Sequence, residues 1–154
     1  MRCSIVQFDL IYNLHPMIIN LIKQEGAYHF QAENESGSKI NIDASPSIGG
    51  TNQGPRPMEL LIMGLGGCSG IDILSILRKQ KIEPDGFSIH ISAEREKGAT
   101  PALFTEIHVR FTLKGDIDPG KVERAAQLSM DKYCSVAKTL EKTANITYSV
   151  VIEK

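Results

Sequence analysis

The sequence lacks any excess of charge of one sign. Its 17 Lys and Arg are nearly balanced by 18 Asp and Glu, so the net charge is −1. The two signs are interleaved along the chain, and no basic stripe marks a surface for nucleic acid or for an anionic membrane. We therefore expect neither of these partners, and a small, weakly charged ligand is favoured instead.

A long uncharged run is also missing. The most apolar stretch, residues 57–78, has only twelve uncharged residues in a row between Glu59 and Asp72, whereas a bilayer span needs about 20. The start of the chain contains Asp9 and His15 where a secretory leader would have a clean apolar run. The sequence thus predicts a cytoplasmic protein with no membrane partner.

Cysteine is scarce, with three residues in 154. An odd number in a reducing compartment argues against a structural disulfide framework, and paired thiols there are more often redox-active. Cys3 lies in residues 1–16, which have no clear hydrophobic period and which we interpret as an N-terminal extension. We assign Cys3 no role and expect one domain over residues 17–154.

Residues 17–154 alternate between strand-like and helix-like patterns. The expected strands are 17–24, 27–34, 39–43, 87–96, 103–114 and 145–153, and the expected helices are 57–79 and a segment that opens at 118, with a break near Cys134 where Ser135 caps a new turn. Strand alternation turns Arg95, Leu103 and Thr105 inward. The predicted fold class is α+β, with antiparallel sheets packed around one long hydrophobic helix.

The helix at 57–79 is apolar on every side, yet it carries Gly64, Gly66, Gly67 and Gly70. Each glycine costs about 1 kcal/mol relative to alanine in a helix interior, which is tolerated where another backbone or a ligand approaches closely. One modest sheet and one amphipathic helix can cover only part of such a surface. A second copy of the chain is the simplest cover, so we expect a homodimer.

Cys68 lies in the middle of this glycine patch. Taken alone, a packed and inert core thiol is the more common interpretation of such a residue. The second cysteine segment, Tyr133-Cys134-Ser135-Val136, shifts the balance toward chemistry. A thiolate that displaces an alcohol from a hydroperoxide becomes a sulfenic acid, and a nearby second thiol condenses with it before irreversible oxidation.

These two segments, Gly66-Gly67-Cys68 within PRPMELLIMGLGGCSGIDILSIL and Tyr133-Cys134-Ser135-Val136 within MDKYCSVAKTLEKTANITYSV, resemble the paired cysteine motifs of the OsmC/Ohr family of thiol-dependent peroxidases. The likeness is greatest to the YhfA-type branch and covers about residues 17–154. It implies an intertwined homodimer with sites at the subunit interface and no cofactor. It also implies that Cys68 attacks a small organic hydroperoxide, that Cys134 resolves the product, and that a dithiol reductant restores the pair, as in oxidative-stress defence.

The sequence departs from the best-known family members, which use an arginine from the N-terminal strand region and a glutamate near the helix start. No arginine occurs between Arg2 and Arg56. Glu59 lies nine residues before Cys68, about 180° away on a helix, so it faces away from the thiol. Arg95, by strand parity, and then Arg56 are the candidates to stand in for the missing arginine.

Two further residues on the helix are candidate neighbours of the thiol. Gly67 adjoins Cys68, and Asp72 lies one turn later on the same face, where its carboxylate opposes ionisation of a thiol unless it is itself paired. The histidines are expected on polar strand faces, and Cys68, Cys134 and a distant histidine lack the close spacing of a zinc site. The sequence therefore predicts no metal.

A second functional interpretation stays open. The same fold can serve as a non-enzymatic or repurposed domain that binds a small apolar or sulfur-containing ligand, with Cys68 retained for packing or as a covalent sensor. The missing N-terminal arginine favours this alternative, and the two cysteines in the expected segments favour the peroxidase.

Overall fold

A computed structural model describes residues 16–154 of the protein. These residues fall into two compact units, the first ending at Arg56 and the second spanning Pro57–Lys154. Nearly all of the expected extension 1–16, including Cys3, lies outside the described residues. The single domain over 17–154 stays a prediction, and the two units are described separately below.

The first unit is an antiparallel meander, as the alternation predicted. Its strand order is β1-β2-β3, formed by β1 (Ile19–Lys23), β2 (Phe30–Asn34) and β3 (Lys39–Ile42). A short 3₁₀ turn, η1 (Pro46–Ile48), follows in the loop toward residue 56. The Asp43 carboxylate accepts backbone N–H bonds from Ala44, Thr51 and Gln53. Hydrogen bonds from Gln53, Thr51 and Ala44 hold its pKa down at about 2, so it stays charged and ties this loop together at neutral pH.

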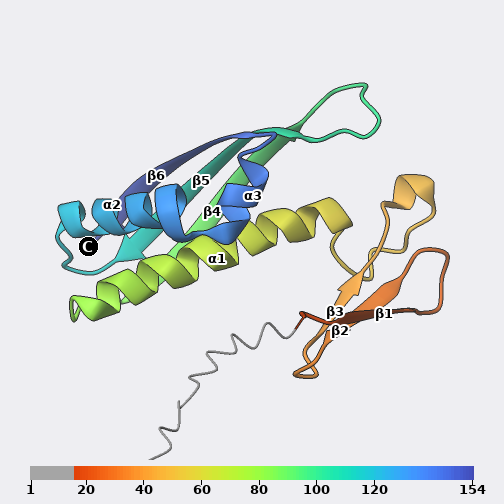
Figure 1. The fold of residues 1–154 in the computed structure, drawn as a ribbon, viewed down its shortest axis with the longest axis horizontal. Helices are drawn as coiled ribbons and strands as arrows, with labels where there is room; N and C mark the ends of the chain where they lie inside the picture. The colour runs from red at the N-terminus through yellow and green to blue at the C-terminus, as the bar shows by residue number, and fades with distance from the viewer. Residues whose placement is uncertain (1–15) are drawn as a thin grey trace, which may run out of the picture. The chain divides into compact units, whose positions relative to one another are not determined.

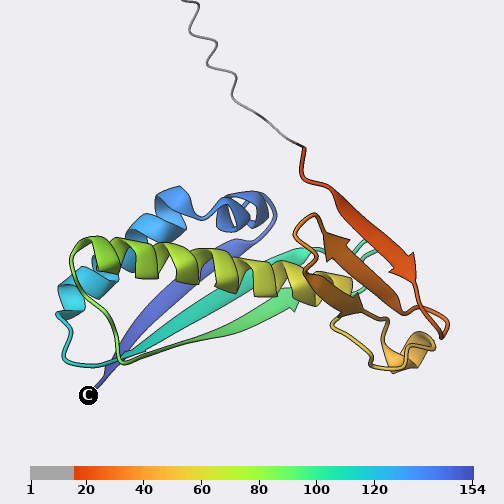
Figure 2. The ribbon, with the colours of Figure 1, turned by 90° about the horizontal axis from the view of Figure 1, so that it is seen from below.

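The second unit contains the helix that carries Cys68. Its elements are α1 (Pro57–Lys79), β4 (Gly86–Arg95), β5 (Phe104–Lys114), α2 (Pro119–Leu128), a π-helical turn η2 (Ser129–Tyr133), α3 (Ser135–Leu140) and β6 (Asn145–Glu153). The strands form one sheet in the order β4-β5-β6, and α1, α2 and α3 all lie on the same face of it (Figures 1 and 2). The predicted bounds of the α1 helix are confirmed, as is the α+β class.

The expectation of purely antiparallel strands is wrong for β6. This strand pairs with β5 in parallel, with Ile107 beside Ile146 and Leu113 beside Ile152. Between β5 and β6 the chain runs through α2, η2 and α3, which return it to the start of the sheet. Such a helical crossover is what allows two successive strands of one sheet to run in the same direction.

The strand parity expected for Leu103 and Thr105 is also wrong. A bulge interrupts the β4–β5 register after Glu94, so that Arg95 pairs with Phe104 and Thr105 is skipped. An extra residue reverses the alternation beyond it. Phe104 is therefore buried, while Leu103 is 41% exposed. Arg95 pairs with this buried Phe104, so its parity in β4 is unchanged, but its side chain is exposed and its guanidinium donates twice to the Ala102 carbonyl, at 3.0 and 2.7 Å.

The core of the second unit lies between α1, α2, α3 and the inward face of the sheet. Its largest fully buried apolar side chains come from α1, β5 and α2: Leu65, Ile73 and Leu77 of α1, Ile107, Val109, Phe111 and Leu113 of β5, and Val122 of α2. Polar residues such as His90 and Arg110 occupy the opposite face of the sheet. Figure 2 shows that no helix of this unit covers that polar face.

Two glycines of α1 allow β4 to approach closely. A Cβ at Gly66 would lie 3.1 Å from Ile91 Cδ1, and one at Gly70 would lie 2.7 Å from Ile89 Cδ1. The other two glycines behave differently, because a Cβ at Gly64 or Gly67 meets nothing within 4 Å in the described residues. The close approach expected from the glycine patch is thus confirmed on the sheet side of the helix.

The outward side of α1 remains apolar and exposed. Leu61, Met63 and Ile71 are 44%, 55% and 71% exposed. By length and composition alone α1 is apolar enough to cross a membrane, and 33% of its most apolar window is buried. One such helix is weak evidence for a membrane span, because core helices of soluble proteins pass the same test.

Gly70→Ala should destabilise the protein by about 1–2 kcal/mol, since overpacking costs about 1–3 kcal/mol and alanine recovers about 1 kcal/mol of helix propensity. Urea denaturation measures this difference. Ile89→Val removes the Cδ1 atom that the new methyl group would meet, so the double variant should lose less stability than the two single variants add up to. Strictly additive losses would contradict the close packing of α1 on β4.

Candidate active site

Cys68 and Asp72 occupy one face of α1. They stand four residues apart in a helix that begins at Pro57, carries Glu59 in its first turn and ends with Arg78 and Lys79 in its last turn. Residues at i and i+4 of a helix lie one above the other. Both side chains are half-buried, so they lie where the helix passes from the core to the surface.

Cys134 lies at a sharp break in the second helical segment. The π-helical turn η2 precedes it, and the Cys134 amide donates to the Ser129 carbonyl at 2.8 Å. The chain is extended at Cys134, and the next residue starts α3. Single π turns inside helical segments are frequent at functional sites. The predicted break is confirmed, but the capping residue is Cys134 itself, whereas Ser135 is already helical.

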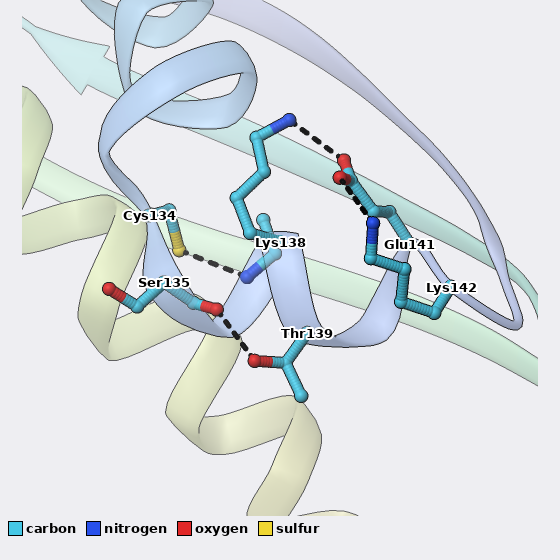
Figure 3. Close-up of polar contacts among 7 residues, drawn as sticks. Cys134, Ser135, Lys138, Thr139, Glu141 and Lys142 are labelled. Atoms are coloured by element: carbon cyan, nitrogen blue, oxygen red, sulfur yellow. Dashed lines mark hydrogen bonds and ion pairs between the residues drawn. The ribbon is translucent and has the colours of Figure 1, made fainter.

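The Cys134 thiol caps α3. Its Sγ accepts a hydrogen bond from the Ala137 amide at 3.4 Å, in the position that a serine or aspartate oxygen usually takes. Figure 3 shows the sulfur at the first turn of α3, with the Ser135–Thr139 and Lys138–Glu141 contacts farther along the same helix. The cap fixes the direction of the sulfur relative to α1.

The fold brings three of the predicted residues together. The sulfur atoms of Cys68 and Cys134 and a carboxylate oxygen of Asp72 all lie within 4.8 Å of one another. The predicted proximity of the two cysteines, which are 66 residues apart in sequence, is therefore confirmed. The expected position of Asp72 beside Cys68 is confirmed as well.

Ser129 is a positioning residue that the sequence did not single out. Its side chain is fully buried, and its hydroxyl lies 3.3 Å from the Ser69 carbonyl and 3.1 Å from Asp72 Oδ2. Its own carbonyl holds the Cys134 amide. One residue thus joins the η2 turn to α1 and orients the Asp72 carboxylate beside the thiols. The only sequence signal for this role was the spacing of Ser129, five residues before Cys134 in the same helical segment.

The two thiols differ in exposure. Cys68 is half-buried, whereas Cys134 is fully buried. Burial, reinforced by the neighbouring Cys68 thiol, raises the pKa of Cys134 to about 11 despite the Ala137 N–H bond. Cys134 is therefore a neutral thiol at physiological pH, and Cys68 is the sulfur that an approaching molecule meets first.

A pocket of about 520 Å³ opens beside Asp72, and neither Cys68 nor Cys134 is among the residues that line it. It is lined by residues of α1 and of the α2–η2 segment: Asp72, Ser75, Ile76, Lys79, Gln80, Leu128 and Tyr133. The mixture of apolar walls and a few polar groups is typical of sites for small molecules. Lys79 brings a cation to the same pocket as Asp72, which the sequence pattern did not indicate.

The other four predicted residues belong to β4, to the loop after β3 and to α1. Arg95 belongs to the β4–β5 hairpin, where it holds the Ala102 carbonyl. Arg56 belongs to the first unit, where it donates to Asn52 Oδ1 and to the Gly54 carbonyl. Glu59 is exposed in the first turn of α1, as expected, and Gly67 is exposed beside Cys68. Roles for these four residues in the site stay predictions.

Comparison with known sequences identifies the family. Residues 50–149 match the family described as OsmC-like protein. Protein YhfA of Escherichia coli strain K12 is 41% identical over 121 residues, which are 78% of this chain and 87% of YhfA. The chain belongs to the OsmC-like family.

Solved structures of OsmC-like proteins share the fold. An OsmC-like protein from Mycoplasma pneumoniae has a TM-score of 0.76 at 17% identity, with 90% of this chain and 98% of that chain covered. An organic hydroperoxide resistance protein OsmC from Legionella pneumophila has a TM-score of 0.68 at 15% identity, with 90% and 98% covered. At these identities the likeness establishes the fold.

Titration of Cys134 tests its environment. In a Cys3→Ser, Cys68→Ser variant, the ultraviolet thiolate absorbance reports Cys134 once the absorbance of the same variant with Cys134→Ala, which carries the same tyrosines, is subtracted, and burial should keep the Cys134 midpoint above the ordinary value of 9.0. Because the folded-state pKa is raised, the stability that the neutral thiol contributes is complete below about pH 9 and is lost between about pH 9 and 11. Replacing Cys134 by alanine in the same background should remove this alkaline loss. A midpoint at or below 9.0 would contradict the burial of this thiol.

Proposed function

We propose that this protein is a thiol-dependent peroxidase that reduces organic hydroperoxides. The Cys68 thiolate attacks the terminal oxygen of ROOH, so that an S–O bond forms, the O–O bond breaks, and the alcohol leaves with a proton. The resulting Cys68 sulfenic acid reacts with the Cys134 thiol, which forms the disulfide and releases water. A dithiol then reduces the disulfide by two successive exchanges.

The observation that carries this proposal is the pair of thiols within 4.8 Å, one accessible and one buried. The accessible Cys68 thiol can attack the hydroperoxide. The buried Cys134 thiol is shielded from the oxidant but lies close enough to Cys68 to form a disulfide with it. The α3 cap and the η2 π turn hold Cys134 beside Cys68, so the formation of the disulfide needs little movement of the chain. Membership of a family that includes an organic hydroperoxide resistance protein adds support.

The pocket beside Asp72 supports a small organic substrate. Ile76 and Leu128 provide apolar contacts for the R group, and Lys79 provides a charge that water-soluble hydroperoxides with an anionic group can use. We propose that the substrate lies along this pocket with its peroxide oxygen toward Cys68. A dithiol reductant that is small enough to enter, or that presents its thiols on a protein surface, completes the cycle.

A cation near Cys68 would favour its thiolate form. We propose Arg95 for this role and Arg56 as the second choice. Arg95 sits in a hairpin whose end carries a bulge, and its bonds to the Ala102 carbonyl are exposed to solvent. Exposed interactions of a charged side chain contribute little free energy. The Arg95 guanidinium can therefore leave the Ala102 carbonyl and bind the Cys68 thiolate if the two approach each other.

We further propose a cytoplasmic homodimer with its two sites at the subunit interface. The outward face of α1 supports this assembly, because Leu61, Met63 and Ile71 are exposed in the described residues and Gly64 and Gly67 leave room for close approach. At about 25 cal/mol per Å² of apolar surface removed from water, covering such a face stabilises an assembly by several kcal/mol.

Rapid mixing of the reduced protein with cumene hydroperoxide tests the activity. Wild type should show a burst of one peroxide per chain, and Cys68→Ser should show none, because a hydroxyl is a far weaker nucleophile than a partly ionised thiol. Cys134→Ser should complete one turnover and then accumulate sulfinic and sulfonic Cys68, which peptide mass spectrometry detects. Peptide mapping of the oxidised wild type should give a Cys68–Cys134 bridge.

Arg95→Ala should slow the burst at neutral pH, with partial recovery at alkaline pH, and Arg110→Ala on the polar face of the sheet serves as the charge-matched control. An unchanged pH–rate profile would eliminate Arg95 and leave Arg56. If no organic hydroperoxide gives a burst while Cys68 still reacts with alkylating reagents, the proposed peroxidase activity is refuted. The alternative is then a non-enzymatic domain that binds a small apolar or sulfur-containing ligand.

Gly67→Ala tests the dimer. In an isolated chain the added methyl group meets open space, so alanine would stabilise the helix by about 1 kcal/mol. In a dimer built on this face the methyl group hinders the partner helix, and sedimentation equilibrium should show weaker association than in wild type. Lys121→Ala on the exposed side of α2 should change neither property. A monomeric wild type at micromolar concentration would contradict the proposal.

A further inference from the structure

Cys68, Cys134 and Asp72 form the donor set of a soft-metal site. Two sulfur atoms and one carboxylate oxygen converge within 4.8 Å, from a helix face and from a helix cap. In tetrahedral zinc sites with Zn–S bonds of about 2.3 Å, two sulfur ligands lie about 3.8 Å apart. The three donor atoms therefore need to close by only about 1 Å to bind one ion.

The arrangement is built rather than accidental. Cys68 and Asp72 stand one turn apart on α1, a spacing that lets two side chains of one helix bind one metal. Ser129 lies 3.1 Å from Asp72 Oδ2, so its hydroxyl orients the carboxylate as an outer-shell partner does in metal sites. Both buried contacts of Ser129 with α1 hold the Cys134 turn in place.

We propose that the reduced protein binds one Zn²⁺ ion per chain through Cys68, Cys134 and Asp72. Two S–Zn bonds form as the two thiol protons pass to solvent, and no electron moves. Three protein ligands leave a fourth position for water. Two thiolates select Zn²⁺ or Cd²⁺ over Mg²⁺, Ca²⁺ and Mn²⁺, which prefer oxygen ligands. The proposal rests on the geometry of the reduced pair and stands whether or not the protein is a peroxidase.

Zinc binding is coupled to the redox state of the site, because the ion and an oxidant need the same two sulfur atoms. A disulfide has no thiolate to offer, so the oxidised protein cannot hold the ion in this way. The metal-bound protein, in turn, presents no free Cys68 thiolate to an electrophile. Zinc therefore acts as a reversible block of the reduced site.

The test is a competition titration of reduced Cys3→Ser protein, in which only Cys68 and Cys134 remain, against a chromophoric zinc chelator. One zinc per chain is expected, with binding lost in Cys68→Ser and in Cys134→Ser and after oxidation of the pair. Asp72→Asn should weaken binding at least 10-fold, and Ser129→Ala by about 10–100-fold, the usual effect of removing an outer-shell partner. Asp131→Asn, which removes the same charge from the η2 turn, should bind like the parent.

Equal affinity in Asp72→Asn and the parent would overturn the three-ligand site, and so would zinc binding that survives loss of either cysteine. A second readout needs no substitution at the site. Zn²⁺ should slow alkylation of Cys68 by iodoacetamide in the wild-type chain, and millimolar Mg²⁺ should not. Unchanged alkylation with zinc present would also refute the proposal.

Discussion

The contacts between Ser129 and α1 determine where the two cysteines of the second unit meet. Cys134 belongs to a short turn between two helices, and without an anchor such a turn would place its thiol with little precision. The Ser129 hydroxyl, buried against the Ser69 carbonyl and the Asp72 carboxylate, supplies the anchor. The Ser129 carbonyl also accepts the Cys134 amide N–H. The position of Cys134 is therefore fixed relative to α1, the helix that carries Cys68.

The same contact fixes the position of the charged group at the site. A carboxylate beside two thiols disfavours their ionisation, and the neutral Ser129 hydroxyl orients the Asp72 carboxylate without cancelling its charge. Burial then separates the thiols: Cys134 stays neutral, with a pKa of about 11, and Cys68 stands half-buried. The same cluster thus offers an accessible sulfur to an oxidant and, when both thiols are reduced, three converging ligands to a soft metal ion.

The glycines of α1 divide the helix into two sides with different roles. Gly66 and Gly70 let Ile91 and Ile89 of β4 come close to the helix backbone, which packs the site-bearing helix tightly on its sheet. Gly64 and Gly67 meet no such neighbour in the part of the chain that the structure describes. Together with the exposed Met63 and Ile71, they leave the outward side of α1 apolar and open, and this is the side on which we propose that a second copy packs.

The sequence by itself determined the α+β class, the bounds of α1 and the identity of the two cysteines, because hydrophobic periodicity and helix end signals are local and strong in this chain. Periodicity could not reveal the bulge after Glu94 or the parallel pairing of β6, since both depend on how distant strands align. Nor could it show the function of Ser129 or the meeting of Asp72 with Cys134. Those features follow from a π turn and a helical crossover, which bring together residues about 60 positions apart in the chain, and only the tertiary structure decided them.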